Sequence, residues 1–403
     1  MKTQIYVFQA ITVGIYLCLA VGLEFLYRDP LFIDSLTWEK EWQSSGSKTL
    51  ESFFKVLTNF GTEPVLIPLL IICFLFFSLQ KSYCFTSVLV YSIFFDNLFK
   101  ILYGNPRPFW VDTTLWKSCD GGFGNPSGHS FTSSSVYLSF WHLSTDYSFF
   151  KDTYYGIIIR VILLILVIAL IIGIMLTRIF LGMHSVNQIL YGASLGVALY
   201  YIVFHAFSLH KWSAEDFFGL FKTAYYKIIF SLWFAALIIT AIVVWKFMEN
   251  DTSLWVDALN SICPDIKEFR KFNNGGLYGM FVLFGLIGCH YGIMFLLRVI
   301  GDSFFGLNDE LNNLNGSFTF LYNLIRILIM LIFTLPLILV LVIPSTSPLV
   351  IIYIFKVALP YFLTMFGLYG PSILVSIKWN CAYNRVRKYS PKFDVEAPID
   401  LSK

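Results

Sequence analysis

Long apolar runs constrain this chain more than any other feature. Many of them match the roughly 20 residues of helix that cross the hydrocarbon core of a bilayer. Of the 403 residues, 57% are hydrophobic and only 13% are charged, whereas about a quarter of a typical soluble domain is charged. Because helices satisfy their own backbone hydrogen bonds in lipid, the sequence predicts an all-α fold, a polytopic membrane helical bundle.

We expect about ten spans, the first of which we interpret as a retained span and not a cleaved signal peptide. That run is longer than a typical signal-peptide core and lacks a small-x-small cleavage site. Helical spacing of apolar residues over 49–60 predicts a short helix, either on the membrane surface or packed as a cap on the bundle. The expected spans are Ile5–Tyr27, Pro64–Leu79, Tyr83–Tyr103, His129–Leu143, Tyr155–Leu176, Val186–Phe207, Tyr225–Phe247, Gly276–Leu297, Leu321–Ile343 and Leu349–Ile377.

The connections between these runs contain no low-complexity linker, and the chain shows no internal repeat. We therefore expect one continuous structural domain with four parts. They are an extra N-terminal span and surface helix (1–61), a catalytic core of the six-helix type (62–210), additional transmembrane helices (211–378) and a tail (379–403).

Basic residues in the tail predict that it lies in the cytosol. With ten spans, the N-terminus would also be cytosolic, and the sequon at Asn250 would lie on the opposite, lumenal side. A net charge of +3, without a basic patch before the tail, argues against a nucleic-acid partner. The expected partner surface is the lipid bilayer.

The seven cysteines show no CxxC spacing, and most fall inside apolar runs. We interpret them as buried structural thiols. On this basis, the sequence indicates neither a disulfide framework nor a cysteine metal site.

Three polar segments interrupt the apolar runs and lie at the ends of neighbouring spans, on one predicted membrane face. Cations at a span end can also reach toward lipid headgroups, and a lone histidine is more often structural, so each segment alone is a weak signal. The segments are 100–108, 124–129 and 177–188.

Together, these segments would place Lys100, Arg107 and Arg178 beside His129 and His184. Three cations suit a dianion such as a phosphoryl group. Two histidines allow one imidazole to attack phosphorus while the other protonates the leaving oxygen. Because no cluster of carboxylates with metal-ligand spacing accompanies them, we expect a site that works without a metal or another cofactor.

The second segment supplies backbone donors. Gly124, Ser127 and Gly128 allow N–H groups to point at an anion, and a helix begins at this point, so its N-terminus adds partial positive charge. This segment is therefore the expected phosphate cradle.

At these residues the sequence resembles the superfamily of type-2 phosphatidic acid phosphatases, glucose-6-phosphatases and vanadium haloperoxidases. The resemblance rests on Lys100-x6-Arg107-Pro108, Pro126-Ser127-Gly128-His129 and Arg178-x5-His184. It implies that His184 is the nucleophile that becomes phosphohistidine and that His129 is the general acid. It further implies that the phosphoryl oxygens are bound by Lys100, Arg107, Ser127, Gly128 and Arg178.

Two positions depart from the common pattern of the superfamily, and we expect both to support the site. Thr177 replaces the usual serine and keeps the hydroxyl. Gln188 replaces the aspartate of most lipid phosphatases; its neutral amide can orient an imidazole but stabilises the imidazolium less. Glucose-6-phosphatases also have glutamine at the position of Gln188.

Loose similarity to glucose-6-phosphatase covers most of the chain after residue 61, including the region of Cys119 and the trailing spans. We therefore expect a glucose-6-phosphatase-like phosphomonoesterase of the endoplasmic reticulum with a lumenal site. Two alternatives stay open: a lipid phosphate phosphatase acting on phosphatidate, a sphingoid-base phosphate or a polyprenyl diphosphate, and a binder or transporter that does not cleave its phosphorylated ligand.

Overall fold

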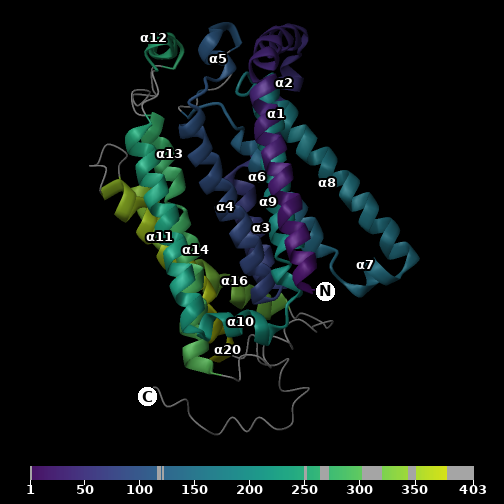
Figure 1. Ribbon diagram of the computed structural model, residues 1–403, viewed down its shortest axis with the longest axis vertical. Helices are drawn as coiled ribbons and strands as arrows, with labels where there is room; N and C mark the ends of the chain where they lie inside the picture. The colour runs from purple at the N-terminus through teal and green to yellow at the C-terminus, as the bar shows by residue number, and fades with distance from the viewer. Residues whose placement is uncertain are drawn as a thin grey trace. The chain divides into compact units, whose positions relative to one another are not determined.

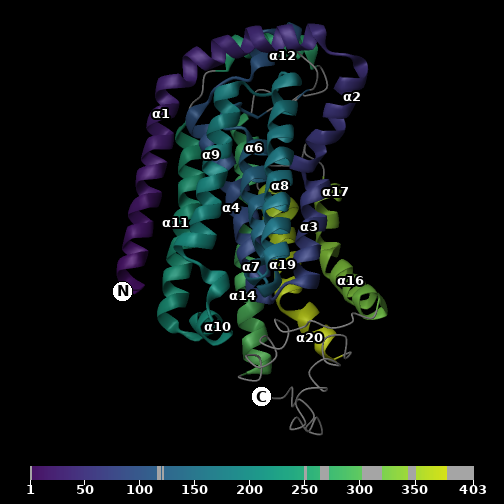
Figure 2. The same cartoon turned by 90° about the vertical axis from the view of Figure 1, so that its right-hand side faces the viewer.

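The computed structural model describes residues 2–115, 119, 122–248, 252–263, 272–301, 320–343 and 351–378. These residues form helices joined by loops (Figures 1 and 2), so the all-α prediction is confirmed over them. The sequon at Asn250 and the tail 379–403 lie outside the described residues. The chain divides into two compact units, one made of residues 1–73, 80–212 and 228–283 and one made of residues 74–79, 213–227 and 284–403. The predicted four-part division remains a prediction.

The first unit holds all three polar segments. Its helices are α1 (Lys2–Ser45), α2 (Lys48–Leu57), η1 (Thr58–Gly61), α3 (Glu63–Phe76, up to Cys73), α4 (Leu79–Tyr103, from Gln80), α5 (Pro108–Val111), η2 (Thr113–Leu115), α6 (Gly128–Ser144), α7 (Ser148–Asp152), α8 (Tyr154–Phe180), α9 (Val186–Tyr201), η3 (Ile202–Ala206), η4 (Leu209–Lys211), α11 (Ala224–Phe247, from Ile228), α12 (Ser253–Ile262) and α13 (Phe272–Met280).

Helix α1 is longer than the first predicted span and runs on to Ser45 without a break. Its first part runs beside α9, and its later part lies across the end of the unit where α12 also lies (Figure 2). The short helix predicted over 49–60 is present as α2 and η1. Phe54 of α2 is buried, with its ring centroid 5.0 Å from that of Phe180, so α2 packs as a cap on the bundle.

Helix α6 lies at the centre of this unit, between α8 and α9. It is rich in serine, and Ser130, Ser134 and Ser135 are all buried. The Ser135 hydroxyl donates to Phe131 O at 3.0 Å, within its own helix, and the Ser134 hydroxyl reaches Ala193 O of α9 at 3.3 Å. Small side chains with satisfied hydroxyls let these two helices approach closely.

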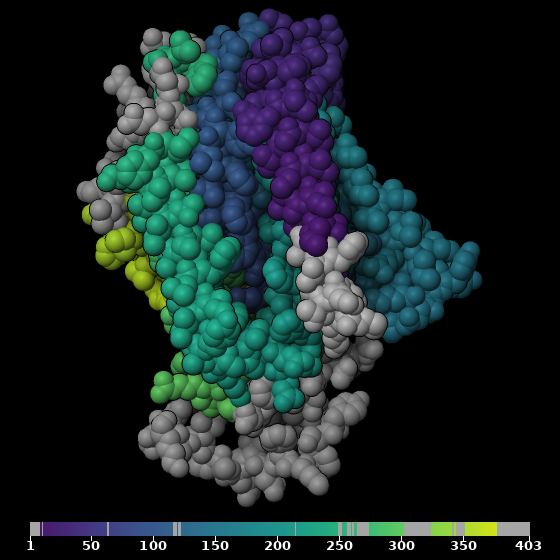
Figure 3. Space-filling view, in the orientation of Figure 1, coloured from purple at the N-terminus to yellow at the C-terminus, as the bar shows by residue number. Residues whose placement is uncertain are grey.

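Several helices expose apolar side chains in the way expected of lipid-facing surfaces. On α8, Ile165 and Leu166 are 60% and 59% exposed, and the atoms of this part of the chain form an edge of the first unit in Figure 3. On α1, Leu26 is 75% exposed. In water such surfaces would be unfavourable, whereas lipid solvates them. The structure fits an integral membrane protein.

The described residues contain seven helical stretches long and apolar enough to cross a membrane, or up to eight if the bent pair Lys48–Gly61 and Pro64–Phe76 is one span. The predicted count of about ten is not confirmed. One reason is that α6 has only 17 residues; another is that Pro336 lies in a 3₁₀ turn inside an expected span. The seven stretches are Ile11–Ser45, Leu79–Val111, Tyr154–Phe180, Val186–Lys211, Ala224–Phe247, Asn274–Ile300 and Ile352–Ser376.

The second unit contains the later helices and packs through aromatic and backbone contacts of its own. Phe221 of α10 lies 4.6 Å from His290 of α14 between ring centroids. Arg326 of α16 donates to Phe74 O at 3.1 Å and to Leu75 O at 3.2 Å. Its helices are α10 (Ala214–Lys222), α14 (Leu283–Ile300), α16 (Phe320–Thr334), η6 (Leu335–Leu337), α17 (Ile338–Val342), η7 (Ile352–Ala358), α19 (Leu359–Tyr369) and α20 (Pro371–Lys378).

Candidate active site

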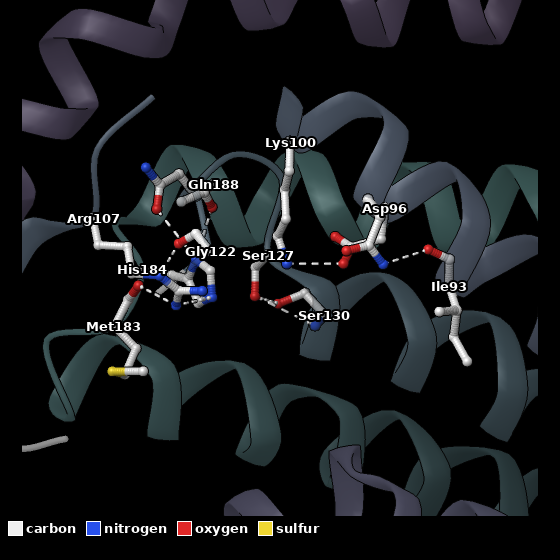
Figure 4. A network of polar contacts seen from close by, with 12 residues as sticks. Ile93, Asp96, Lys100, Arg107, Gly122, Ser127, Ser130, Met183, His184 and Gln188 are labelled. Carbon is white, nitrogen blue, oxygen red and sulfur yellow. Dashed lines mark hydrogen bonds and ion pairs between the residues drawn. The ribbon is translucent and has the colours of Figure 1, made fainter. Parts of the chain in front are cut away.

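The three polar segments meet at one end of the first unit. Lys100 is in the last turn of α4, Ser127 is the N-cap of α6, and Arg178 is in the last turn of α8. His184 lies in the short loop between α8 and α9, close to Arg107 (Figure 4). The convergence expected from span order is therefore present in the fold.

His184 is 1% exposed, and both of its ring nitrogens have partners. Nδ1 lies 2.8 Å from Gly124 O and 3.2 Å from the Gln188 side-chain oxygen. Because both of these atoms are acceptors, Nδ1 carries the hydrogen and donates it. Nε2 then holds a lone pair, and it accepts from Arg107 Nη1 at 3.1 Å. In this tautomer the Nε2 lone pair faces Arg107.

Gln188 fixes that tautomer. Its side-chain nitrogen donates to Pro106 O at 2.8 Å, which turns its oxygen toward His184 and the backbone N–H of Ser185. Gly124 packs against this contact, because a Cβ there would lie 2.5 Å from Pro106 O. The neutral amide thus contacts the imidazole and also caps α9.

Arg107 is held by the backbone of two loops. It is 1% exposed, its Nε donates to Gly122 O at 2.6 Å, and its Nη1 donates to Met183 O at 3.2 Å. The guanidinium therefore sits beside His184 Nε2 with its orientation set before any ligand binds. Such preorganised cations suit charge that develops on a phosphoryl group.

Lys100 reaches the start of α6. Its Nζ forms an ion pair with Asp96 Oδ2 at 2.8 Å, one turn earlier in α4. A Cβ at Gly128 would lie 2.6 Å from the same carboxylate oxygen and 3.1 Å from Lys100 Nζ. A side chain at position 128 would therefore displace this ion pair, and the ammonium lies against the N-terminus of α6.

Ser127 accepts hydrogen bonds at the start of α6. Its Oγ receives the Ser130 N–H at 3.5 Å and the Ser130 hydroxyl at 3.1 Å, and its backbone N–H donates to Gln188 O at 3.0 Å. These contacts use the acceptor capacity of the hydroxyl, so its own hydrogen can be donated to an anion.

Arg178 and His129 are positioned by the α2–η1 region. Arg178 is 5% exposed, and its Nη1 donates to the Thr58 hydroxyl at 2.9 Å. Gly61 lies against the His129 ring, since a Cβ at Gly61 would be 2.8 Å from ring Cδ2. Thr177 behaves differently from the other predicted residues, because its hydroxyl donates to Ile174 O of its own helix at 2.7 Å.

Helix α1 contributes polar contacts that were not predicted from the sequence. Glu24 is fully buried and accepts from the Asn125 side-chain amide at 2.7 Å. The Ser35 hydroxyl accepts the Val186 backbone N–H at 2.9 Å, and the Gln43 side chain donates to Phe180 O at 2.7 Å. The N-terminal helix is therefore built into the site, and it fixes both ends of the loop that carries His184.

Between those two contacts lies Glu39, which is 0% exposed. It is one turn from Ser35 and one turn from Gln43, so all three share one face of α1. Neither carboxylate oxygen of Glu39 has a hydrogen-bond partner among the described residues. The charged form of such a buried acid is unfavourable, so the group is neutral unless a ligand supplies donors.

The structure contains a disulfide between Cys119 and Cys263, which are 144 residues apart. The prediction that the sequence indicates no disulfide is therefore wrong for this pair. The two cysteines lie in loops at the site end, and they link the segment that carries Gly122 to the end of α12. Spacing rules miss such a link because only the fold brings these loops together.

Comparison with known families supports the interpretation of the three segments. Residues 70–212 match the family model described as the PAP2 superfamily. That range includes every predicted site residue. No match was found among curated proteins or among solved structures. The match supports the PAP2 superfamily and a phosphatase-type function for this region.

The pKa of His184 lies well below its usual value of 6.5, first because of burial and then because of the positive charges of Arg107, Arg178, Lys100 and His129. We expect its ring to remain neutral at pH 6.5. Because the unfolded chain would bind this proton more readily, lowering the pH below 6.5 should reduce the free energy of unfolding.

The measurement is a pH titration of histidine ring NMR signals in the labelled protein, with the His184 signal assigned from its loss in His184→Asn. Half-protonation of that signal near pH 6.5 would contradict the expectation.

Proposed function

We propose that this protein is a membrane phosphomonoesterase that forms a phosphohistidine on His184. The observation that carries the proposal is the geometry of that imidazole. Its Nδ1–H is held by Gly124 O and Gln188, and its Nε2 lone pair faces Arg107.

In the first step, His184 Nε2 attacks phosphorus, the bond between phosphorus and the leaving oxygen breaks, and His129 donates a proton to that oxygen. In the second step, His129 takes a proton from water, the water oxygen attacks phosphorus, and the N–P bond breaks. Inorganic phosphate leaves and both imidazoles return to their starting states.

The phosphoryl oxygens would be bound by side chains and backbone that the fold already holds in place. Arg107 keeps its backbone contacts and shifts one N–H from His184 to the phosphoryl group. Lys100 and Arg178 supply further positive charge, and Ser127 and Gly128 supply hydrogen-bond donors at the N-terminus of α6. Thr177 would act indirectly, through the last turn of α8.

Trapping the intermediate tests this mechanism. Protein quenched during turnover of a ³²P-labelled phosphate ester is expected to carry acid-labile, base-stable phosphate, and peptide mapping should place it on His184. Turnover without any labelled protein would argue for direct attack by water instead.

For the substrate, we propose a hydroxyl-rich phosphate ester such as glucose 6-phosphate, with the site on the lumenal side of the endoplasmic reticulum. Two observations support this choice. Gln188 is the residue that glucose-6-phosphatases have at this position, and the buried carboxylate of Glu39 would accept hydrogen bonds from substrate hydroxyls. A lipid phosphate is the alternative, and comparable turnover of glucose 6-phosphate and phosphatidate in one assay would remove the preference.

Replacing Glu39 with glutamine tests the role of that carboxylate. A hydrogen bond to a neutral group contributes about 0.5–1.5 kcal/mol. We therefore expect KM for glucose 6-phosphate to rise about 3-fold or more, while KM for p-nitrophenyl phosphate, which has no sugar hydroxyls, stays within about two-fold.

The matched control is Glu41→Gln, two residues away on the same helix and exposed, which should change neither constant. An equal rise of KM for both substrates in Glu39→Gln would show that Glu39 affects the phosphate site and does not recognise hydroxyls.

A further inference from the structure

Three polar side chains that the proposed mechanism does not use lie together at the far end of α6. Ligand atoms of His142, Asp146 and His210 all lie within 4.8 Å of one another. His142 and His210 are each 5% exposed. The 13 residues from His129 to His142 correspond to about 20 Å along the helix, so this cluster is separate from the candidate active site.

We propose that His142, Asp146 and His210 form a binding site for a transition-metal ion of the zinc type. Two imidazoles and one carboxylate are ligands that such ions prefer, whereas magnesium and calcium prefer oxygen ligands.

The geometry of the two histidines fits a shared ion. Their Nε2 atoms are 3.2 Å apart, and their ring centroids are 4.9 Å apart with planes at 86°. An ion bonded tetrahedrally to both at 2.0–2.1 Å would hold the nitrogens about 3.3 Å apart and the centroids about 5 Å apart. A straight N–H···N hydrogen bond would separate the centroids by about 5.5 Å. The observed centroid distance is shorter than this value and closer to the value expected for a shared ion.

The second ring nitrogens are compatible with metal ligation. His142 Nδ1 lies 2.9 Å from the Tyr200 hydroxyl, which can accept its hydrogen and leave the Nε2 lone pair for the ion, as second partners of metal-bound histidines do. His210 Nδ1 has no hydrogen-bond partner among the described residues. No hydrogen bond at Nδ1 therefore fixes the tautomer of His210, and its Nε2 can hold the lone pair that an ion needs.

Several positive charges surround the cluster and would compete with a cation. Lys81 and Lys151 both pair with the Asp146 carboxylate, Lys81 at 3.0 Å, and Lys211 and Arg160 act at longer range. The Lys151 side chain is 43% exposed, so it can move into water when an ion binds. The carboxylate also has more acceptor positions than two lysines use.

Such an ion would join the C-terminal end of α6 to the η3–η4 segment that follows α9. At their other ends, α6 carries His129 and α9 carries Gln188. The ion would therefore fix the helix pair on which the candidate active site is built, without touching substrate.

Zinc binding by purified protein tests the proposal. After chelator treatment, zinc loading and removal of excess metal, elemental analysis should find about one zinc per chain, which His142→Ala and His210→Ala should lose. The control is His205→Ala, which removes a neighbouring histidine that contacts Tyr200 but is not part of the cluster. A cobalt-loaded sample should show the absorption of a tetrahedral site.

Lys151→Ala provides a second test that does not depend on the folding of the histidine variants. Removing this exposed competitor should tighten zinc binding several-fold, measured by competition with a chelating dye. Zinc content that does not depend on His142 or His210, or an affinity that Lys151→Ala leaves unchanged, would overturn the proposal and identify the cluster as a hydrogen-bonded histidine pair.

Discussion

Replacing His184 with alanine is expected to lower phosphate release at least about 1,000-fold, because the proposed reaction has no other nucleophile. Binding of the oxyanion should change little, since Lys100, Arg107 and Arg178 remain. The measurements are steady-state phosphate release and the affinity for inorganic phosphate, which is the reaction product and forms no bond to the imidazole when it only binds. A loss of turnover with retained phosphate binding separates an enzyme from a protein that only binds a phosphorylated ligand.

Two further variants make this result specific. His184→Asn also lacks the imidazole, so it should be as inactive as the alanine variant. Because its amide can keep a donor toward Gly124 O, it should fold at least as well. His205→Ala changes a histidine far from the site and should keep full activity. Hydrolysis that persists at more than a few percent in both His184 variants would exclude the phosphohistidine mechanism.

The sequence predicted the helical class and the main spans because hydropathy reports directly on burial in lipid. It did not predict that α1 continues past Arg28 to Ser45. The later part of α1 buries two polar residues, Ser35 and Glu39, and Ser35 contacts the start of α9 after the loop from α8. Apolar periodicity cannot detect a helix whose buried face is polar.

The sequence also predicted that the three polar segments converge, because its motifs are short local strings at the ends of neighbouring helices. The remaining parts of the candidate site depend on contacts between distant residues. Thr58 reaches Arg178 across 120 residues, Asn125 reaches Glu24 across 101, and Cys119 pairs with Cys263 across 144. In a single sequence, nothing about residue type or spacing connects these partners.

Replacing Arg107 with lysine is expected to lower kcat/KM by about 100-fold, although the charge is kept. Arg107 uses Nε on Gly122 O and Nη1 on Met183 O and His184. One ammonium group cannot hold two loops and also contact a phosphoryl oxygen in a fixed direction. The loss should appear mainly in kcat, because preorganised donors act most strongly on charge that develops during the transfer.

Comparison with Arg107→Met separates charge from geometry. Methionine removes both the charge and the hydrogen-bond donors. The lost charge is also one of those that hold the pKa of His184 below its usual value. We therefore expect a loss larger than that of Arg107→Lys. Arg160→Lys, on α8 but over the ring of Trp141, is the matched control and should stay within about two-fold of the natural protein. If Arg107→Lys were equally active, the contacts with Gly122 and Met183 would be structural, and the charge of Arg107 alone would account for its role at the phosphate.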